Sequence, residues 1–130
     1  MSDSDVDIPA RASELNMNVE AIIDTEILDE VREDLEEDFD DFVEQFFDDA
    51  QTWVTEIRQA VDVGDAETVY QRAHTLKSSC GYLGASDLAE TARVLEEMGR
   101  AGSVTAADGL ASKVGDELDR VRNAIAQILG

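Results

Sequence analysis

Residues 39–64 read FDDFVEQFFDDAQTWVTEIRQAVDVG, and this stretch decides the fold class. Its apolar side chains recur in steps of three and four for about six turns, the spacing of one face of an α-helix. They are Phe39, Phe42, Val43, Phe46, Ala50, Trp53, Val54, Ile57 and Val61. The pattern stops at Gly64. The sequence therefore predicts a long amphipathic helix whose aromatic-rich side belongs to the core and not to a cofactor site.

The same spacing predicts four more helices, over about residues 25–36, 65–84, 86–99 and 105–129. Asp24, Asp65 and Ser86 are the expected N-caps, and Gly64 and Gly84 stand where a helix C-terminus needs glycine. Short connections force neighbouring helices to run antiparallel. The predicted fold is therefore all-α: an antiparallel up-and-down four-helix bundle with a short additional N-terminal helix, which lies against the bundle or covers one end.

Composition narrows the classes of function. The chain has 130 residues, one domain's worth, and a net charge of −21, which disfavours binding to nucleic acid or to an anionic membrane surface. No apolar run reaches the ~18 residues of a membrane span, and the first residues lack a secretory signal pattern. The single cysteine, Cys80, rules out an intrachain disulfide. We expect a cytoplasmic protein.

The acidic charge is concentrated at the N-terminal end. Residues 1–50 hold 19 of the 31 acidic residues and only two basic ones. Residues 1–20 are polar, acidic and without helical period, so we expect a mobile tail there. Residues 21–130 then form the bundle domain.

The one histidine lies in the segment His74-Thr-Leu-Lys-Ser-Ser-Cys-Gly-Tyr-Leu-Gly84. On a helical wheel it stands about 140° from the middle of the apolar stripe of its helix, so its ring faces water. Ser78 and Gly81, on the same face, are small and would leave open space above the ring. Lys77 is three residues on, which places an ammonium group beside anything attached to the imidazole.

Phosphoryl transfer is the chemistry that fits such a histidine. A neutral imidazole is a nucleophile near pH 7, and phosphoryl transfer depends mainly on positioning and on charge stabilisation. Metal binding is disfavoured because there is no second histidine, and Cys80 lies about 120° around the helix from His74, which also disfavours a Cys–His dyad. A stand-alone kinase or phosphatase is disfavoured because the sequence has no glycine-rich phosphate loop.

The pattern His74-x-Leu76-Lys77-x₆-Gly84 resembles the signature of histidine phosphotransfer (HPt) domains, the helical-bundle intermediates of multistep phosphorelays. It is similar to the phosphotransfer domain of chemotaxis histidine kinases, and the resemblance extends over about residues 25–129. One departure is Ser78, which stands where the family usually has glycine. Because serine is small, we expect access to the histidine to be kept, with a slightly narrower approach.

The resemblance implies a role for each site residue. His74 would be the phosphoacceptor through Nε2, and Lys77 would pair with the phosphoryl oxygens. Family members often carry Gln or Glu 22 residues after the histidine, bonded to Nδ1, and here that position is Glu96. The helical wheel independently places Glu96 at the border of the core, whereas Glu90 and Glu97 point outward.

The resemblance also implies function and partners. The chain would accept a phosphoryl group from a receiver-domain aspartate or a histidine kinase and pass it to a response-regulator aspartate. It would have no kinase activity, metal or cofactor of its own, since the partner supplies Mg²⁺. The expected partners are receiver domains and a sensor or hybrid histidine kinase, and the chain is expected to be a monomer. Docking is expected on the His74 helix and the helix before it, at Tyr70, Gln71, Ser78 and Tyr82, which are expected to be exposed, and at Gly81.

Simpler interpretations of the same residues stay open. His74 could be an ordinary surface histidine and Lys77 a solvated lysine. Glu96 could be an ion-paired carboxylate, Gly81 could serve close helix packing, and Ser78 could be a neutral helix residue. Together they describe the alternative function, a non-catalytic helical adaptor that binds a signalling partner without being phosphorylated.

Overall fold

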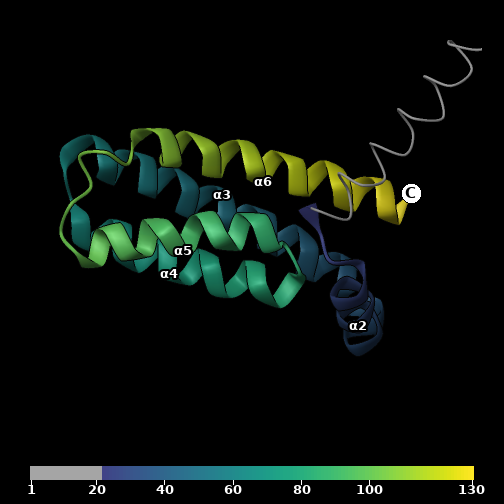
Figure 1. The fold of residues 1–130 in the computed structure, drawn as a ribbon. Coiled ribbons are helices and arrows are strands. Elements are labelled where there is room, and N and C mark those ends of the chain that lie inside the picture. The colour runs from purple at the N-terminus through teal and green to yellow at the C-terminus, as the bar shows by residue number, and fades with distance from the viewer. Residues whose placement is uncertain (1–21) are drawn as a thin grey trace, which may run out of the picture.

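The computed structural model describes residues 22–130, and the regular elements in this range are all helices. The predicted all-α class is confirmed, whereas the tail expected over residues 1–20 lies outside the described residues. Figure 1 shows the elements in order along the chain. They are α2 (Thr25–Leu35), the 3₁₀ turn η1 (Glu36–Asp38), α3 (Phe39–Val63), α4 (Ala66–Leu83), α5 (Ser86–Arg100) and α6 (Asp108–Leu129).

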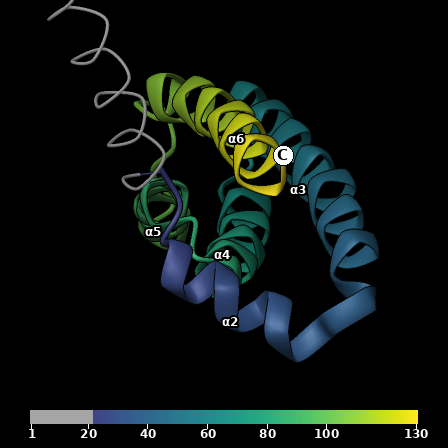
Figure 2. The same ribbon diagram turned by 90° about the vertical axis from the view of Figure 1, so that its right-hand side faces the viewer.

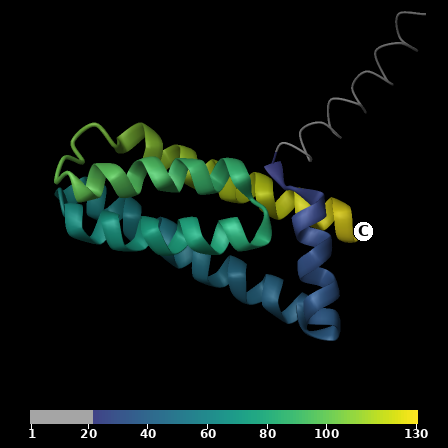
Figure 3. The ribbon, with the colours of Figure 1, turned by 60° about the horizontal axis from the view of Figure 1, so that its bottom comes forward.

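The four long helices form the predicted up-and-down bundle. Helix α4 packs on α3, α5 packs on α4, and α6 packs on both α5 and α3, so the four helices enclose one core (Figure 2). The short helix α2 crosses one end of this bundle and contacts α3 and α4 (Figure 3). Within residues 22–130, no helix combines the length and the apolar character that crossing a bilayer requires.

Local sequence sets the start of α2 and α4 and the end of α3 and α4. The Asp24 carboxylate accepts hydrogen bonds from two backbone N–H groups at the start of α2. The Asp65 carboxylate accepts from the hydroxyl and the backbone N–H of Thr68, and these two bonds hold the pKa of Asp65 below its usual range. Gly64 and Gly84 end α3 and α4 with φ of 74° and 90°, the left-handed conformation that glycine adopts without a Cβ penalty.

One predicted cap is wrong. Helix α5 begins at Ser86, and the N-cap position is held by Ala85, whose side chain makes no capping bond. The backbone N–H of Ala85 donates to Cys80 O at 2.9 Å, which wraps the chain tightly around the end of α4. The Ala85 side chain is buried in the connection between α4 and α5, and Ser86 is exposed on the first turn of α5.

The last helix also begins later than predicted, at Asp108 and not near Thr105. Val104 and Ala107 are both buried, so the connection from α5 packs against the core before the helix starts. The predicted helix was therefore about one turn too long at its start.

The core follows the predicted apolar stripes. Its largest fully buried side chains come from every helix of the bundle, from α2 and from the residues just before α2: Ile23, Leu28, Val54, Ile57, Val69, Leu76, Leu83, Leu88, Leu95, Val114, Leu118 and Ile125. The aromatic side of α3 is only partly core, however. Phe39 and Phe46 are buried, whereas Phe42 and Trp53 are half-buried at the edge of the α3–α4 seam.

Candidate functional site

Helix α4 presents His74 to solvent. Its buried stripe consists of Val69, Ala73, Leu76, Cys80 and Leu83, and His74 lies on the other side of the helix. The His74 side chain is 54% exposed. The ring is therefore accessible to a visiting macromolecule, as the helical wheel predicts.

Helix α5 supplies the partner of the imidazole. Glu96 is only 3% exposed at its side chain, and its Oε2 lies 2.6 Å from His74 Nδ1. An ionised carboxylate can only accept, so Nδ1–H is the donor of this bond. The bond therefore selects the tautomer in which Nε2 carries a free lone pair on the exposed side of the ring. Glu90 and Glu97 point into solvent, as predicted from the wheel.

Lys77 also contacts Glu96, a partner that the sequence did not predict. Its Nζ donates to Glu96 Oε1 at 2.7 Å, and its side chain is 34% exposed. This bond holds the pKa of the Glu96 carboxyl below its usual range, against the effect of burial, and the bond from His74 adds to the lowering. Glu96 is therefore ionised at neutral pH and bridges the imidazole and the ammonium group.

Two further side chains complete the surroundings of the imidazole. Arg100 lies one turn after Glu96 on α5, with its guanidinium 3.6 Å from Glu96 Oε2 and 5.4 Å from the centroid of the Tyr70 ring. The Tyr70 ring in turn stacks on His74, with centroids 6.2 Å apart and planes at 25°. Sequence reasoning missed Arg100, although the Glu96–Arg100 spacing of four residues is a recognisable ion-pair signal.

Most of the predicted docking residues are exposed. Gln71, Ser78, Gly81 and Tyr82 face solvent, whereas Tyr70 is half-buried, which corrects the expectation that it is exposed. A Cβ added at Gly81 would meet no atom within 4 Å, so close helix packing does not explain this glycine. The Ser78 hydroxyl donates to His74 O at 3.1 Å and so stays close to its own helix.

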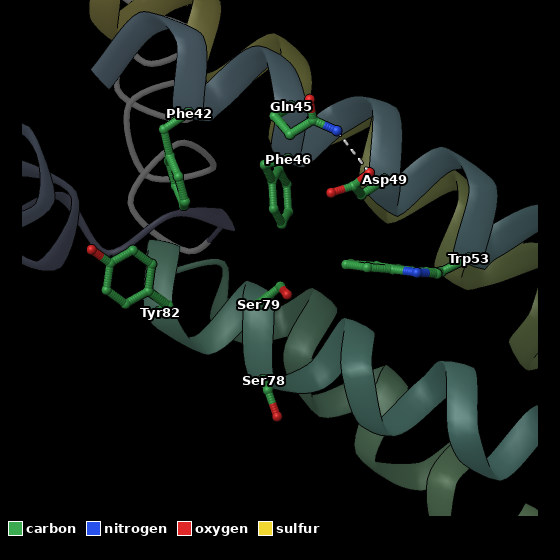
Figure 4. Close-up of a pocket in the computed structure, with 8 residues that line it drawn as sticks. All are labelled: Phe42, Gln45, Phe46, Asp49, Trp53, Ser78, Ser79 and Tyr82. Atoms are coloured by element: carbon green, nitrogen blue, oxygen red, sulfur yellow. Dashed lines mark hydrogen bonds between the residues drawn. The ribbon is translucent and has the colours of Figure 1, made fainter. Parts of the chain in front are cut away.

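A groove of about 300 Å³ runs beside this surface, between α3 and α4. Figure 4 shows Phe42, Phe46 and Trp53 projecting from α3 toward α4, where Ser79 faces them and Ser78 points away. The groove is lined by Phe42, Gln45, Phe46, Asp49, Trp53, Ser78, Ser79 and Tyr82. The small Ser79 does not fill the seam, which explains why two aromatic residues of α3 stay half-buried.

The part of the chain that the structure describes gathers no group of three His, Cys, Asp or Glu side chains that could hold a metal ion. Cys80 is buried in the apolar stripe of α4. The site therefore consists of His74, Glu96, Lys77, Arg100 and Tyr70, on two adjacent helices.

Comparison with known proteins agrees with this arrangement. The sequence matches the family model of the Hpt domain over residues 41–124, which is more than half of the chain. The structure resembles the crystal structure of histidine-containing phosphotransfer protein B (HptB) from Pseudomonas aeruginosa PAO1, with a TM-score of 0.78 and 26% sequence identity over 82% of this chain and 92% of that chain. No curated protein sequence matches this one. The chain thus belongs to the Hpt domain family, whose members act as histidine phosphotransfer intermediates of phosphorelays.

Proposed function

We propose that His74 carries the phosphoryl group in this chain and that Nε2 is the nitrogen that reacts. The observation that supports this most strongly is the 2.6 Å bond between His74 Nδ1 and the buried Glu96 carboxylate. Because that bond occupies Nδ1, the nucleophilic lone pair is left on Nε2. The exposed ring allows a partner's phosphoaspartate to approach along this direction.

The transfer itself needs little from the protein beyond positioning. The Nε2 lone pair attacks the phosphorus atom of an aspartyl phosphate, the new N–P bond forms as the P–O bond to aspartate breaks, and aspartate leaves as a carboxylate. Nδ1 keeps its proton, so positive charge develops on the ring, and Glu96 stabilises that charge. The reverse sequence delivers the phosphoryl group to the aspartate of the next receiver domain.

Lys77 is the proposed electrostatic partner of the phosphoryl oxygens. An ammonium group has three N–H donors, and Glu96 accepts from one of them at 2.7 Å. The other donors can reach outward while this bond is kept, since Lys77 stands one helical turn from His74 on the same face. Lys77 would then hold Glu96 ionised and also offset the charge of the incoming group.

The exposed surface around His74 is the proposed docking site for receiver domains. Gln71, Ser78, Gly81 and Tyr82 lie on α4 with His74 and are exposed, so a partner can contact them. Tyr70 is half-buried and stacked on His74, so its proposed role in this docking site is to support the imidazole ring.

The wider role follows from the family. We propose that the chain acts in the cytoplasm as a monomeric carrier without kinase activity, between a sensor or hybrid histidine kinase and a response regulator. The proposed phosphotransfer domain covers residues 21–130, because α2 packs on the bundle that the family model matches.

The test is phosphoryl transfer from a phosphorylated receiver domain. Wild-type protein should gain one phosphate that is labile in acid and stable in base, and His74→Gln should gain none. Circular dichroism would show that the variant is folded. Equal labelling of wild type and His74→Gln would place the phosphate elsewhere. Binding of receiver domains without any labelling of the wild type would support the adaptor alternative.

A further inference from the structure

Helices α4 and α5 approach each other backbone to backbone at Gly99, and the missing side chain of this residue allows the approach. A Cβ added at Gly99 would lie 2.5 Å from Tyr70 N, 2.8 Å from Tyr70 Cα and 2.8 Å from Ala66 O. All three are main-chain atoms of α4, which cannot swing aside as the end of a side chain can. Any side chain at position 99 therefore requires α5 to move away from α4.

Other helical glycines in the described residues do not play this part. At Gly115, in α6, an added Cβ would meet only Val54 Cγ1, at 3.6 Å, an ordinary van der Waals contact. Glycine in a helix interior costs about 1 kcal/mol relative to alanine. At Gly99 that cost is offset by the close approach of two helices, which no other residue type would permit.

The contact lies next to the proposed reaction site. Glu96 precedes Gly99 by three residues, and His74 follows Tyr70 by four, so both lie one turn from the contact. Because α4 and α5 are antiparallel, those turns lie in the same direction along the pair. A helix rises 1.5 Å per residue, so the His74–Glu96 bond is roughly 5 Å from the contact.

The hydrogen bond between His74 and Glu96 would not survive a large separation of α4 and α5. Ordinary van der Waals contact begins near 3.4 Å, so relief of the 2.5 Å approach means a displacement of about 0.9 Å at Gly99. The Nδ1–Oε2 distance is 2.6 Å, and hydrogen bonds weaken beyond about 3.2 Å. A separation of this size one turn away is enough to break the bond or to pull Glu96 off its place between His74 and Lys77.

We propose that Gly99 is a positioning residue for phosphotransfer: it sets the distance between α4 and α5 at which Glu96 holds the His74 ring in its reactive tautomer. This inference rests on the proposed role of His74. Its central consequence, the tautomer of the resting imidazole, can be measured without any phosphate.

The test uses the fact that the chain has one histidine. Long-range ¹H–¹⁵N spectra of the ¹⁵N-labelled protein at about pH 8 report which ring nitrogen carries the proton. Wild type should show Nδ1–H. In Gly99→Ala this preference should be lost as it is in Glu96→Ala, and transfer from a phosphorylated receiver should slow on the order of tenfold. Gly115→Ala, the matched glycine replacement, should keep the wild-type tautomer and rate.

A second variant covers the case in which Gly99→Ala does not fold. Glu96→Asp leaves the contact intact and shortens the carboxylate by one methylene. If the contact fixes the helix spacing, the shorter side chain cannot reach Nδ1, and the tautomer preference should be lost. A wild-type tautomer in Glu96→Asp, or in folded Gly99→Ala, would overturn the proposal. Failure of His74→Gln to abolish labelling would instead refute the proposed function and leave the tautomer result standing.

Discussion

The Lys77 ammonium group and the imidazole of His74 are held by the same carboxylate, since Glu96 accepts from Lys77 at 2.7 Å through Oε1 and from His74 at 2.6 Å through Oε2. The buried Glu96 carboxylate thereby links the position of the Lys77 ammonium group to that of the His74 ring. Charge-assisted hydrogen bonds of this kind are about twice as strong as neutral ones. A substitution at any one of these three residues should consequently change the position of the other two side chains.

The first prediction concerns Lys77. In Lys77→Ala the phosphoryl group loses its cation and Glu96 loses its shortest bond to a positive charge, so transfer from a phosphorylated receiver should slow by roughly 10- to 100-fold. Lys113→Ala is the matched control, because Lys113 is the only other lysine of the chain and is exposed on α6. Stopped-flow or rapid-quench labelling would measure both. Equal rates for the two variants would remove Lys77 from the site.

The second prediction is a pH dependence of stability. The pKa of Glu96 is lowered in the folded protein, chiefly by the bond from Lys77. A carboxyl group with a lowered pKa stabilises the fold above its unfolded pKa of about 4.3, and this contribution is lost as pH falls through the lower, folded value. The difference in unfolding free energy between wild type and Glu96→Gln should therefore be largest at neutral pH and shrink below about pH 4.

Urea titrations at neutral and acidic pH would measure that difference. Glu97→Gln is the control, because Glu97 is the next residue of α5 and its side chain is exposed. Its effect on stability should be small at both pH values. A gap between wild type and Glu96→Gln that is the same at neutral and acidic pH would show that the Glu96 charge does not contribute to stability.

The third prediction compares two glycines with positive φ. Gly64→Ala, with φ of 74° and no atom within 4 Å of the added Cβ, should cost only the strain of the left-handed conformation, about 1 kcal/mol. At Gly84, φ is 90° and the Cβ would lie 2.9 Å from Asp24 O and 3.1 Å from Ile27 Cβ. Gly84→Ala should therefore cost more, about 2–3 kcal/mol, because α2 must shift as well. Equal shifts of the urea midpoint would contradict the tight contact with α2.

The fourth prediction concerns the single thiol. Burial, with a smaller contribution from the Glu117 carboxylate, raises the pKa of Cys80 to about 12. Since the thiolate is the reactive form, Cys80 should not react with a disulfide reagent at pH 8 in the folded protein and should react promptly in urea. Rapid reaction without denaturant would mean that α4 opens locally near the site.

Helix positions and the outward placement of His74 were predictable because both depend on local periodicity. The placement of Glu96 was predictable too, since a helical wheel gives the direction of a side chain around its own axis. A wheel contains no information about the distance between two helices. That distance decides whether Lys77 reaches Glu96 or points outward, so the Lys77–Glu96 bond could not be derived from the sequence.

The N-cap of α5 was predicted wrongly for a related reason. Ser86 has the side chain of a good cap, but the backbone of Ala85 is already drawn onto the end of α4 by its bond to Cys80 O. Similarly, Gly99 reads in the sequence as the end of a helix near a turn. Only the packing of α4 against α5 shows that the backbone of Tyr70 fills the space where a side chain at position 99 would lie.

The way α2 packs on the bundle has a consequence for the order in which the elements fold. The backbone N–H of its N-cap residue, Asp24, donates to Gly84 O at 2.8 Å, and we expect this acceptor to reach its position only once α4 and α5 have formed their hairpin. Helix α2 should accordingly dock after the hairpin and detach before it. In hydrogen-exchange experiments, we expect the amides of α2 to exchange through small local openings while those of the hairpin remain protected.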